Sequence, residues 1–188
     1  MWIIYHGYHQ ISTPLLAALV HQHLFSPISD SFGVANASSN SQLSLGDRIY
    51  QSWEKYITGE PLTTLSFVGV DCCGNRILIL ERRRFFTILK RTVEAGLSLT
   101  HNRKPVLWVD TSSCTNRQLE LGIWLLRNTT KLRRAYSEPA HANVSHQQAI
   151  LRRGENLTRR GIKQAVPRIC DLVLKQTPCC LDVHFLKR

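Results

Sequence analysis

The first 22 residues, MWIIYHGYHQISTPLLAALVHQ, place two buried elements almost end to end. Residues 2–5 are all apolar or aromatic, which is typical of a strand that is covered on both faces. After a polar turn over 5–13, an apolar helix is predicted to about residue 24, with Ser12 or Thr13 as its N-cap and Pro14 at its first helical position. A buried strand that leads directly into a helix indicates an α/β sheet.

The rest of the chain continues this alternation of strands and helices. Two β-rich runs, 63–70 and 76–80, flank the sequence DCCGN, which suits a tight turn, so a β-hairpin is predicted. A second fully apolar run lies at 105–109. Helices are predicted from apolar residues at helical spacing over 47–57, 82–96, 118–127 and 161–176. Pro167 is expected to kink or split the last of these helices.

These elements predict an α/β fold with a mixed, mainly parallel sheet and flanking helices. We expect a Rossmann-like or P-loop-like three-layer arrangement with one β-hairpin, in which the runs 2–5 and 105–109 are central parallel strands. One domain is expected over 1–176, followed by a tail over 177–188. Within the domain, 26–46 and 128–158 lack apolar periodicity and are expected to be rich in loops.

Composition limits the class of protein. No apolar run approaches the roughly 20 residues that a membrane helix needs. His6 and His9 interrupt the first apolar stretch, which also lacks the basic start of a signal peptide, so a cytoplasmic protein without a membrane partner is expected. The six cysteines are then expected to be reduced, and none has the paired spacing of a zinc site, so no metal site is predicted.

The positive charge is concentrated near the C-terminus. Residues 127–188 contain 13 Lys and Arg against 4 Asp and Glu, so this third supplies +9 of the formal net charge of +11. Such a segment is either a solvated surface or a site for a polyanion such as nucleic acid. Neither an RNA-binding motif nor a zinc finger is present to support nucleic-acid binding.

The turn over 5–13 is the first candidate site. In open α/β sheets ligands bind at the carboxyl ends of parallel strands, and the free amides at a helix N-terminus attract anions. The glycine and lysine pattern of a P-loop or a dinucleotide turn is absent, so an ordinary helix cap is the alternative interpretation. The candidate side chains for binding a phosphate-bearing small molecule are Tyr5, His6, Tyr8, Ser12 and Thr13.

The end of the 105–109 run is the second candidate. Asp110 closes a buried strand, where an acidic residue can hold a metal ion or orient water, and Thr111 would add a ligand-binding hydroxyl. Cys114, close to the next helix, is a candidate nucleophile if its pKa is lowered there. The alternatives are that Asp110 only caps a turn and that Cys114 is a buried, inert thiol.

Three other groups of polar residues are assigned no catalytic role. Asp71 is expected to have a structural role in the hairpin turn, and His21 to be a packing or capping residue. Arg82–Arg84 are unfavourable at a helix N-terminus, which favours an anionic partner for them.

Four segments in this order resemble the domain-of-unknown-function family 3189, small proteins of spore-forming Firmicutes. The segments are IIYHGY…LLAALVH, FVGVDCCGNRILILERR, VLWVDTSSC and RRGIKQAVPRICDLV. In the family's first turn and the helix after it, Tyr5, His6, Tyr8 and His21 match, whereas Gly7, His9, Gln10 and Ser12 depart from the pattern, so the chain resembles a divergent member. The resemblance implies a fold and the location of a site. It implies no reaction, cofactor or oligomeric state.

Overall fold

A four-stranded mixed sheet forms the centre of the protein. The computed structural model describes residues 1–7, 12–25, 43–58, 65–81, 86–99, 105–135 and 144–177. The strands are β1 (Trp2–Gly7), β2 (Leu65–Val70), β3 (Arg76–Glu81) and β4 (Val106–Asp110), in the spatial order β2-β3-β1-β4. β1 is parallel to both β3 and β4, and β2 is antiparallel to β3. The predicted mixed α/β fold with one hairpin is confirmed.

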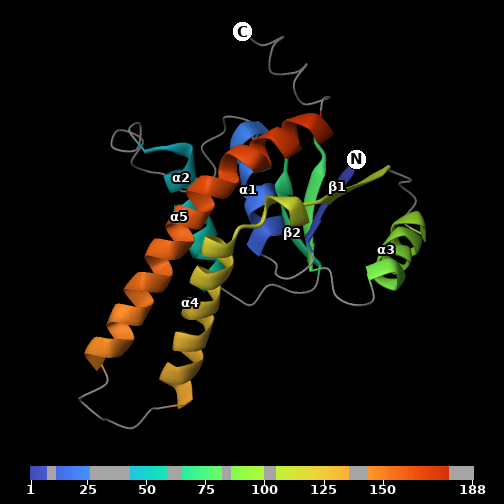
Figure 1. Ribbon diagram of the computed structural model, residues 1–188. Coiled ribbons are helices and arrows are strands. Elements are labelled where there is room, and N and C mark those ends of the chain that lie inside the picture. Colours follow the sequence, from blue (N-terminus) through green and yellow to red (C-terminus); the bar gives the residue numbers. More distant parts are fainter. Residues whose placement is uncertain are drawn as a thin grey trace.

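Helices cover both faces of this sheet and make three layers (Figure 1). α1 (Ser12–Phe25), α2 (Leu45–Thr58), α4 (Arg117–Ala135) and α5 (Val144–Gln176) share one hydrophobic core with one face. α3 (Phe86–Leu99) packs on the other face. A single 3-10 turn over Ser112–Cys114 joins β4 to α4. No helix in the described part of the chain has both the length and the apolar character needed to cross a membrane.

β1 is buried on both faces, as its run of apolar residues predicted. Ile3 and Tyr5 point into the large core beneath α1, and Ile4 belongs to the smaller cluster beneath α3. All three side chains are fully buried. A strand with parallel neighbours on both sides and helices above and below needs apolar residues at every position, which is the pattern seen here.

The 105–109 run is not a central strand. β4 pairs only with β1 and therefore lies at the edge of the sheet, and Val106, Leu107 and Trp108 remain partly exposed. The run is apolar throughout because the large core contacts one side of β4 and α3 contacts the other. A fully apolar run therefore indicates that both faces of a strand are covered, and this can also be true of a strand at the edge of a sheet.

The expectation of a loop-rich segment over 128–158 is wrong for most of its length. α4 continues to Ala135, and α5 begins at Val144. α5 also runs through Pro167 as one helix of 33 residues, so the proline does not split it. The rest of the expected loop segments, 26–42 and 136–143, lies outside the described residues, as does the tail beyond residue 177.

α4 and α5 approach closely because glycines face the contact between them. A Cβ at Gly161 would lie 2.5 Å from the backbone nitrogen of Leu119. A Cβ at Gly122 would lie 2.5 Å from the backbone nitrogen of Thr158 and would also collide with its hydroxyl. The two helices therefore contact one another backbone to backbone and leave little room for large apolar side chains.

A buried carboxylate connects α2 to α5. Asp47 accepts a 2.6 Å hydrogen bond from the Ser44 hydroxyl, and it forms ion pairs with Arg159 at 2.7 Å and Lys163 at 3.0 Å. Its own backbone N–H donates to the Ser44 hydroxyl, which caps the start of α2. The hydrogen bond from Ser44, followed by those from Lys163 and Arg159, lowers the pKa of Asp47 well below its usual range.

Asp47→Asn should lower the free energy of unfolding by about 1–2 kcal/mol at pH 7, because a charged hydrogen-bonded group is lost. Since the pKa of Asp47 is lower in the folded state, its contribution is complete above the unfolded value of about 4 and is lost as the pH falls below it. Urea unfolding between pH 7 and pH 2.5 should therefore show the gap between wild type and variant closing below about pH 4. Glu155→Gln, on the exposed side of α5, is the control. A gap that is constant over the whole range would contradict this account.

Candidate functional site

The carboxyl ends of the three parallel strands meet at one edge of the sheet. Gly7 at the end of β1 is in register with Glu81 at the end of β3, and His6 is in register with Asp110 at the end of β4. The runs 2–5 and 105–109 were predicted as parallel strands, and they do end at the same edge of the sheet.

Thr111 closes the space between β1 and β4 at this edge. Its backbone N–H and its hydroxyl both donate to the carbonyl of His6, at 2.8 and 2.9 Å, and its side chain is fully buried. A Cβ at Gly7 would lie 3.0 Å from the Thr111 Oγ1 and 3.2 Å from two carbons of the Pro14 ring. Gly7 thus allows the strand end, the start of α1 and Thr111 to pack together, and the Thr111 hydroxyl already has a partner.

β1 and β3 are neighbours in the sheet, and the connections that follow them run to opposite faces. β1 leads into α1 on one face of the sheet, whereas β3 leads toward α3 on the opposite face (Figure 1). Diverging connections of this kind leave a crevice between the carboxyl ends of two adjacent parallel strands. The topology therefore places a switch point of this kind between β1 and β3, on the side of β1 away from β4.

The candidate residues of the first turn separate onto different faces. Tyr5 is fully buried in the large core, so its hydroxyl lies away from the edge. The His6 ring packs on the opposite face against Phe86 and Trp108, with ring centroids 4.6 and 6.1 Å away. Tyr8 lies outside the described residues, and Ser12 is described only as the first residue of α1.

Thr13 lies at the edge but is buried. Its hydroxyl is 3.5 Å from the Thr115 hydroxyl, which connects the first turn of α1 to the segment after β4. α1 begins at Ser12, so Ser12 and Thr13 lie within its first turn instead of preceding it. The backbone amides of that first turn are the groups that a helix leaves free for an anion.

Asp110 and Cys114 differ in accessibility. Asp110 is exposed, and its Oδ1 accepts a 2.9 Å hydrogen bond from the backbone N–H of Ser112. Cys114 is buried, and this burial raises the pKa of its thiol. The lowered pKa that would make Cys114 a ready nucleophile is therefore contradicted, and a thiol below its pKa is a weak nucleophile.

A buried polar chain, which we call the Tyr5–His21–Asp71 chain, crosses the core beneath α1. The Tyr5 hydroxyl lies 2.6 Å from the His21 Nδ1, and the His21 Nε2 lies 3.2 Å from the Asp71 Oδ2. Asp71 also accepts hydrogen bonds from the backbone N–H groups of Cys73 and Asn75 and from the Asn75 side chain, at 2.8–2.9 Å. The Tyr5–His21–Asp71 chain connects β1 to the turn between β2 and β3, which fits the structural roles expected for His21 and Asp71.

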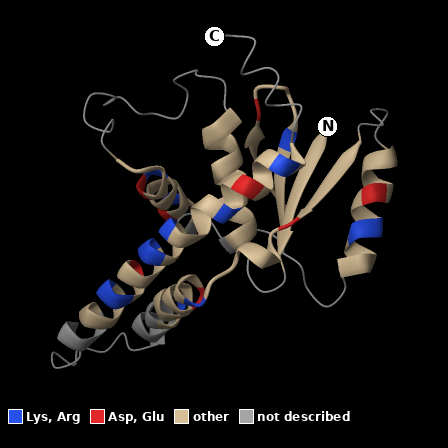
Figure 2. Cartoon of the chain, turned by 45° about the horizontal axis from the view of Figure 1, so that its top comes forward, with Lys and Arg blue, Asp and Glu red and all other residues tan. Residues whose placement is uncertain are grey.

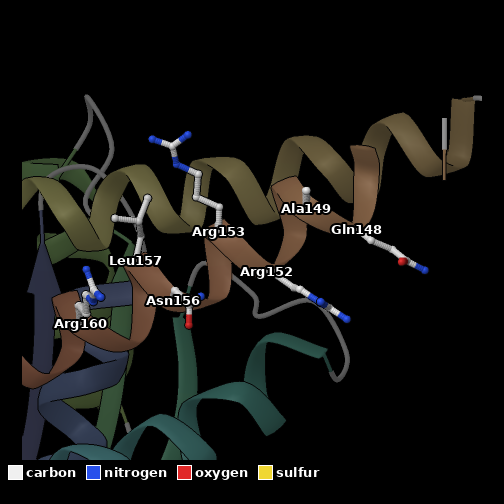
Figure 3. A pocket seen from close by; sticks show the side chains of 7 residues that line it. All are labelled: Gln148, Ala149, Arg152, Arg153, Asn156, Leu157 and Arg160. Atoms are coloured by element: carbon white, nitrogen blue, oxygen red, sulfur yellow. The ribbon is translucent and has the colours of Figure 1, made fainter. Parts of the chain in front are cut away.

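A basic surface lies on the N-terminal half of α5, where the α4–α5 hairpin projects beyond the sheet (Figures 1 and 2). It is a shallow groove of about 620 Å³, lined by Gln148, Ala149, Arg152, Arg153, Asn156, Leu157 and Arg160. Figure 3 shows the guanidinium groups of Arg152 and Arg153 extending in different directions from the helix. We call these seven residues the α5 basic groove.

The arginines of the α5 basic groove are exposed. Among the residues that the structure describes, Arg152, Arg153 and Arg160 form no ion pair, whereas Arg159 and Lys163 on the same helix are paired with Asp47. The charge count over 127–188 identified this region but not these three residues, because the helix from Val144 onward was not expected.

No cluster of three metal-ligating side chains occurs within the described ranges. The predicted anion-binding groups Arg82–Arg84 lie outside them. The described residues define a mixed α/β protein in which the connections after β1 and β3 run to opposite faces of the sheet, with a separate basic helix face on α5.

A family comparison agrees with this description. The model of a family of proteins of unknown function, DUF3189, matches residues 2–136, and the chain belongs to that family. The matched region includes the whole sheet and ends just beyond α4. The search of curated proteins gave no match. The search of solved structures also gave none.

Proposed function

We propose that the protein binds a phosphate-bearing small molecule in the crevice between the carboxyl ends of β1 and β3. The observation that carries this proposal is that the connections after β1 and β3 diverge. After Gly7 the chain leads to α1 on one face of the sheet, and after Glu81 it leads toward α3 on the other face. Ligands of open α/β sheets bind at such positions. In this proposal the protein acts in the cytoplasm, and the chemistry that suits the site is phosphoryl or nucleotide handling.

The groups around the crevice suit an anion. The first turn of α1 supplies backbone N–H groups, which attract anions at a helix N-terminus. Arg82–Arg84 follow Glu81 directly in the sequence and supply the positive charge, while Tyr8 and Ser12 supply hydroxyls from the turn. Asp110 is the acidic group for orienting water, and Tyr5, His6, Thr13, Thr111 and Cys114 hold the edge in place.

The triple variant Arg82→Gln/Arg83→Gln/Arg84→Gln should weaken the binding of pyrophosphate, measured by calorimetry. Loss of a hydrogen bond to a charged group costs about 1.5–3 kcal/mol, so we expect affinity to fall by about ten- to a hundredfold. Arg152→Gln/Arg153→Gln/Arg160→Gln is the matched control, since it removes three arginine charges from α5, and it should leave the affinity unchanged. Equal losses in both variants would mean that only net charge matters.

A second candidate function is the binding of a polyanion such as nucleic acid along the α5 basic groove. It is favoured by three exposed arginines without an ion pair among the described residues. Three phosphate contacts predict a slope of about −2.7 for the logarithm of affinity for duplex DNA against the logarithm of salt concentration. Arg152→Gln/Arg160→Gln should reduce that slope by about 2, measured by fluorescence anisotropy. A slope that this variant leaves unchanged would locate the contact elsewhere.

A further inference from the structure

Two adjacent cysteines occupy the turn between β2 and β3. Neither Cys72 nor Cys73 forms a disulfide bond, and their Sγ atoms lie 4.0 Å apart. Cys73 is exposed and Cys72 is half-buried. The other described cysteines have no cysteine next to them in the sequence. Cys114 is buried, and Cys170 lies half-buried on α5.

Hydrogen bonds hold the backbone of both cysteines in the turn. The backbone N–H of Cys72 donates to the carbonyl of Phe25 at 2.7 Å, and the backbone N–H of Cys73 donates to the Asp71 Oδ1 at 2.9 Å. Gly74 completes the turn at φ +74°, a conformation that glycine adopts without strain. A group attached to one sulfur is therefore within reach of the other without unfolding of the hairpin.

We propose that Cys72 and Cys73 form a site of reversible covalent modification, at which a low-molecular-weight disulfide converts the two thiols into a vicinal disulfide. In the first step the Cys73 thiolate attacks the disulfide, forming a mixed disulfide and releasing one thiol. In the second step the Cys72 sulfur attacks the Cys73 sulfur and releases the second thiol. Two protein thiols are oxidised and one small disulfide is reduced to two thiols, so hydrogen atoms and electrons balance.

The accessibility of the two sulfurs fixes the order of these steps. Cys73 is exposed to an incoming disulfide, whereas Cys72 is partly covered by the core. Burial raises the pKa of the Cys72 thiol, and the neighbouring Cys73 and Asp71 add to this effect, which keeps Cys72 from reacting first.

The product is expected to be easily reduced. Consecutive Cα atoms are about 3.8 Å apart, which is less than the roughly 4.4–6.8 Å that unstrained disulfides span. Strained, exposed disulfides belong to the labile class. Closing the ring must also twist the peptide that carries the Cys73 N–H, so it weakens the bond to Asp71 and with it one end of the Tyr5–His21–Asp71 chain.

The experiment treats the reduced full-length protein with oxidised glutathione and maps tryptic peptides by mass spectrometry. Cleavage after Lys55 and Arg76 yields a peptide of residues 56–76 that contains only Cys72 and Cys73, and Cys179 and Cys180 fall in a different peptide. The proposal expects peptide 56–76 to lose two hydrogen atoms, to carry no glutathione, and to regain both hydrogens with dithiothreitol. A stable glutathione adduct on this peptide, or no reaction of it, would overturn the proposal.

Two single variants separate the steps. Cys72→Ser should retain one glutathione on Cys73, because the second thiol is missing. Cys73→Ser should react much more slowly, because the remaining thiol is half-buried. Equal rates for the two variants would contradict the assignment of Cys73 as the attacking thiol. The oxidised wild-type protein should also melt at a lower temperature than the reduced protein, and an unchanged or higher melting temperature would contradict the weakened bond to Asp71.

Discussion

Gly161→Ala should lower the free energy of unfolding by about 2–3 kcal/mol. The added Cβ would lie 2.5 Å from the backbone nitrogen of Leu119 and 2.7 Å from its Cα, so α4 and α5 would have to separate. Adding one carbon to a packed core costs about 1–3 kcal/mol and more where backbone must move. This cost exceeds the roughly 1 kcal/mol that alanine gains over glycine in a helix. Urea unfolding followed by circular dichroism measures the difference.

Gly96→Ala is the matched control for this substitution. Gly96 lies in α3, and a Cβ there would meet no atom within 4 Å. The variant should be more stable than wild type by about 0.4–1 kcal/mol, because alanine reduces the entropy of the unfolded chain. If both glycine variants were stabilised to the same extent, the close contact between α4 and α5 would be refuted.

Asp71→Ala should lower the free energy of unfolding by about 3–5 kcal/mol. The buried Asp71 carboxylate accepts hydrogen bonds from two backbone amides and the Asn75 side chain, and it lies 3.2 Å from the His21 Nε2. Removing one partner of a buried polar group leaves the others without compensation, which costs more than a surface contact. Chemical denaturation at pH 7 gives the value.

Asp171→Ala provides the comparison for Asp71, since Asp171 is exposed on α5. We expect a change within about 0.5 kcal/mol for that surface residue. Tyr5→Phe should fall between the two variants, because it removes only the hydroxyl that lies 2.6 Å from the His21 Nδ1. A cost for Asp71→Ala as small as that for Asp171→Ala would show that the Tyr5–His21–Asp71 chain does not stabilise the fold.

The sequence predicted the fold where apolar periodicity reports burial directly. The run 2–5 is apolar at every position because both faces of β1 are covered, and the hairpin was visible from its turn residues. The edge position of β4 could not be predicted, because covered faces require apolar residues, whereas the lack of a neighbouring strand imposes no residue pattern. The extension of α4 to Ala135 and the start of α5 at Val144 were missed because 128–158 lacks apolar periodicity, and Gly154 in this segment packs against Leu125 and Leu126 without adding to an apolar stripe.

The sequence predicted where the parallel strands end but not how the side chains are arranged there. The carboxyl edge follows from a buried strand that leads into a helix, and it is where Gly7 and Asp110 lie. The position of the switch point, between β1 and β3, depends on the face on which α3 packs, and no local sequence pattern specifies that face. The alternation of side chains along a strand does predict that Tyr5 and His6 lie on opposite faces. Tyr5 shares the face of Ile3, and His6 shares the face of Ile4.

Titration of the ¹⁵N-labelled protein with pyrophosphate, followed by nuclear magnetic resonance, tests the proposed function most directly. Binding in the crevice predicts saturable shifts of the Gly7 amide and of the amides in the first turn of α1, with those of Arg152 and Arg160 unchanged. Shifts confined to α5, or no saturable shift at Gly7 and the first turn of α1, would contradict a phosphate site at the ends of β1 and β3.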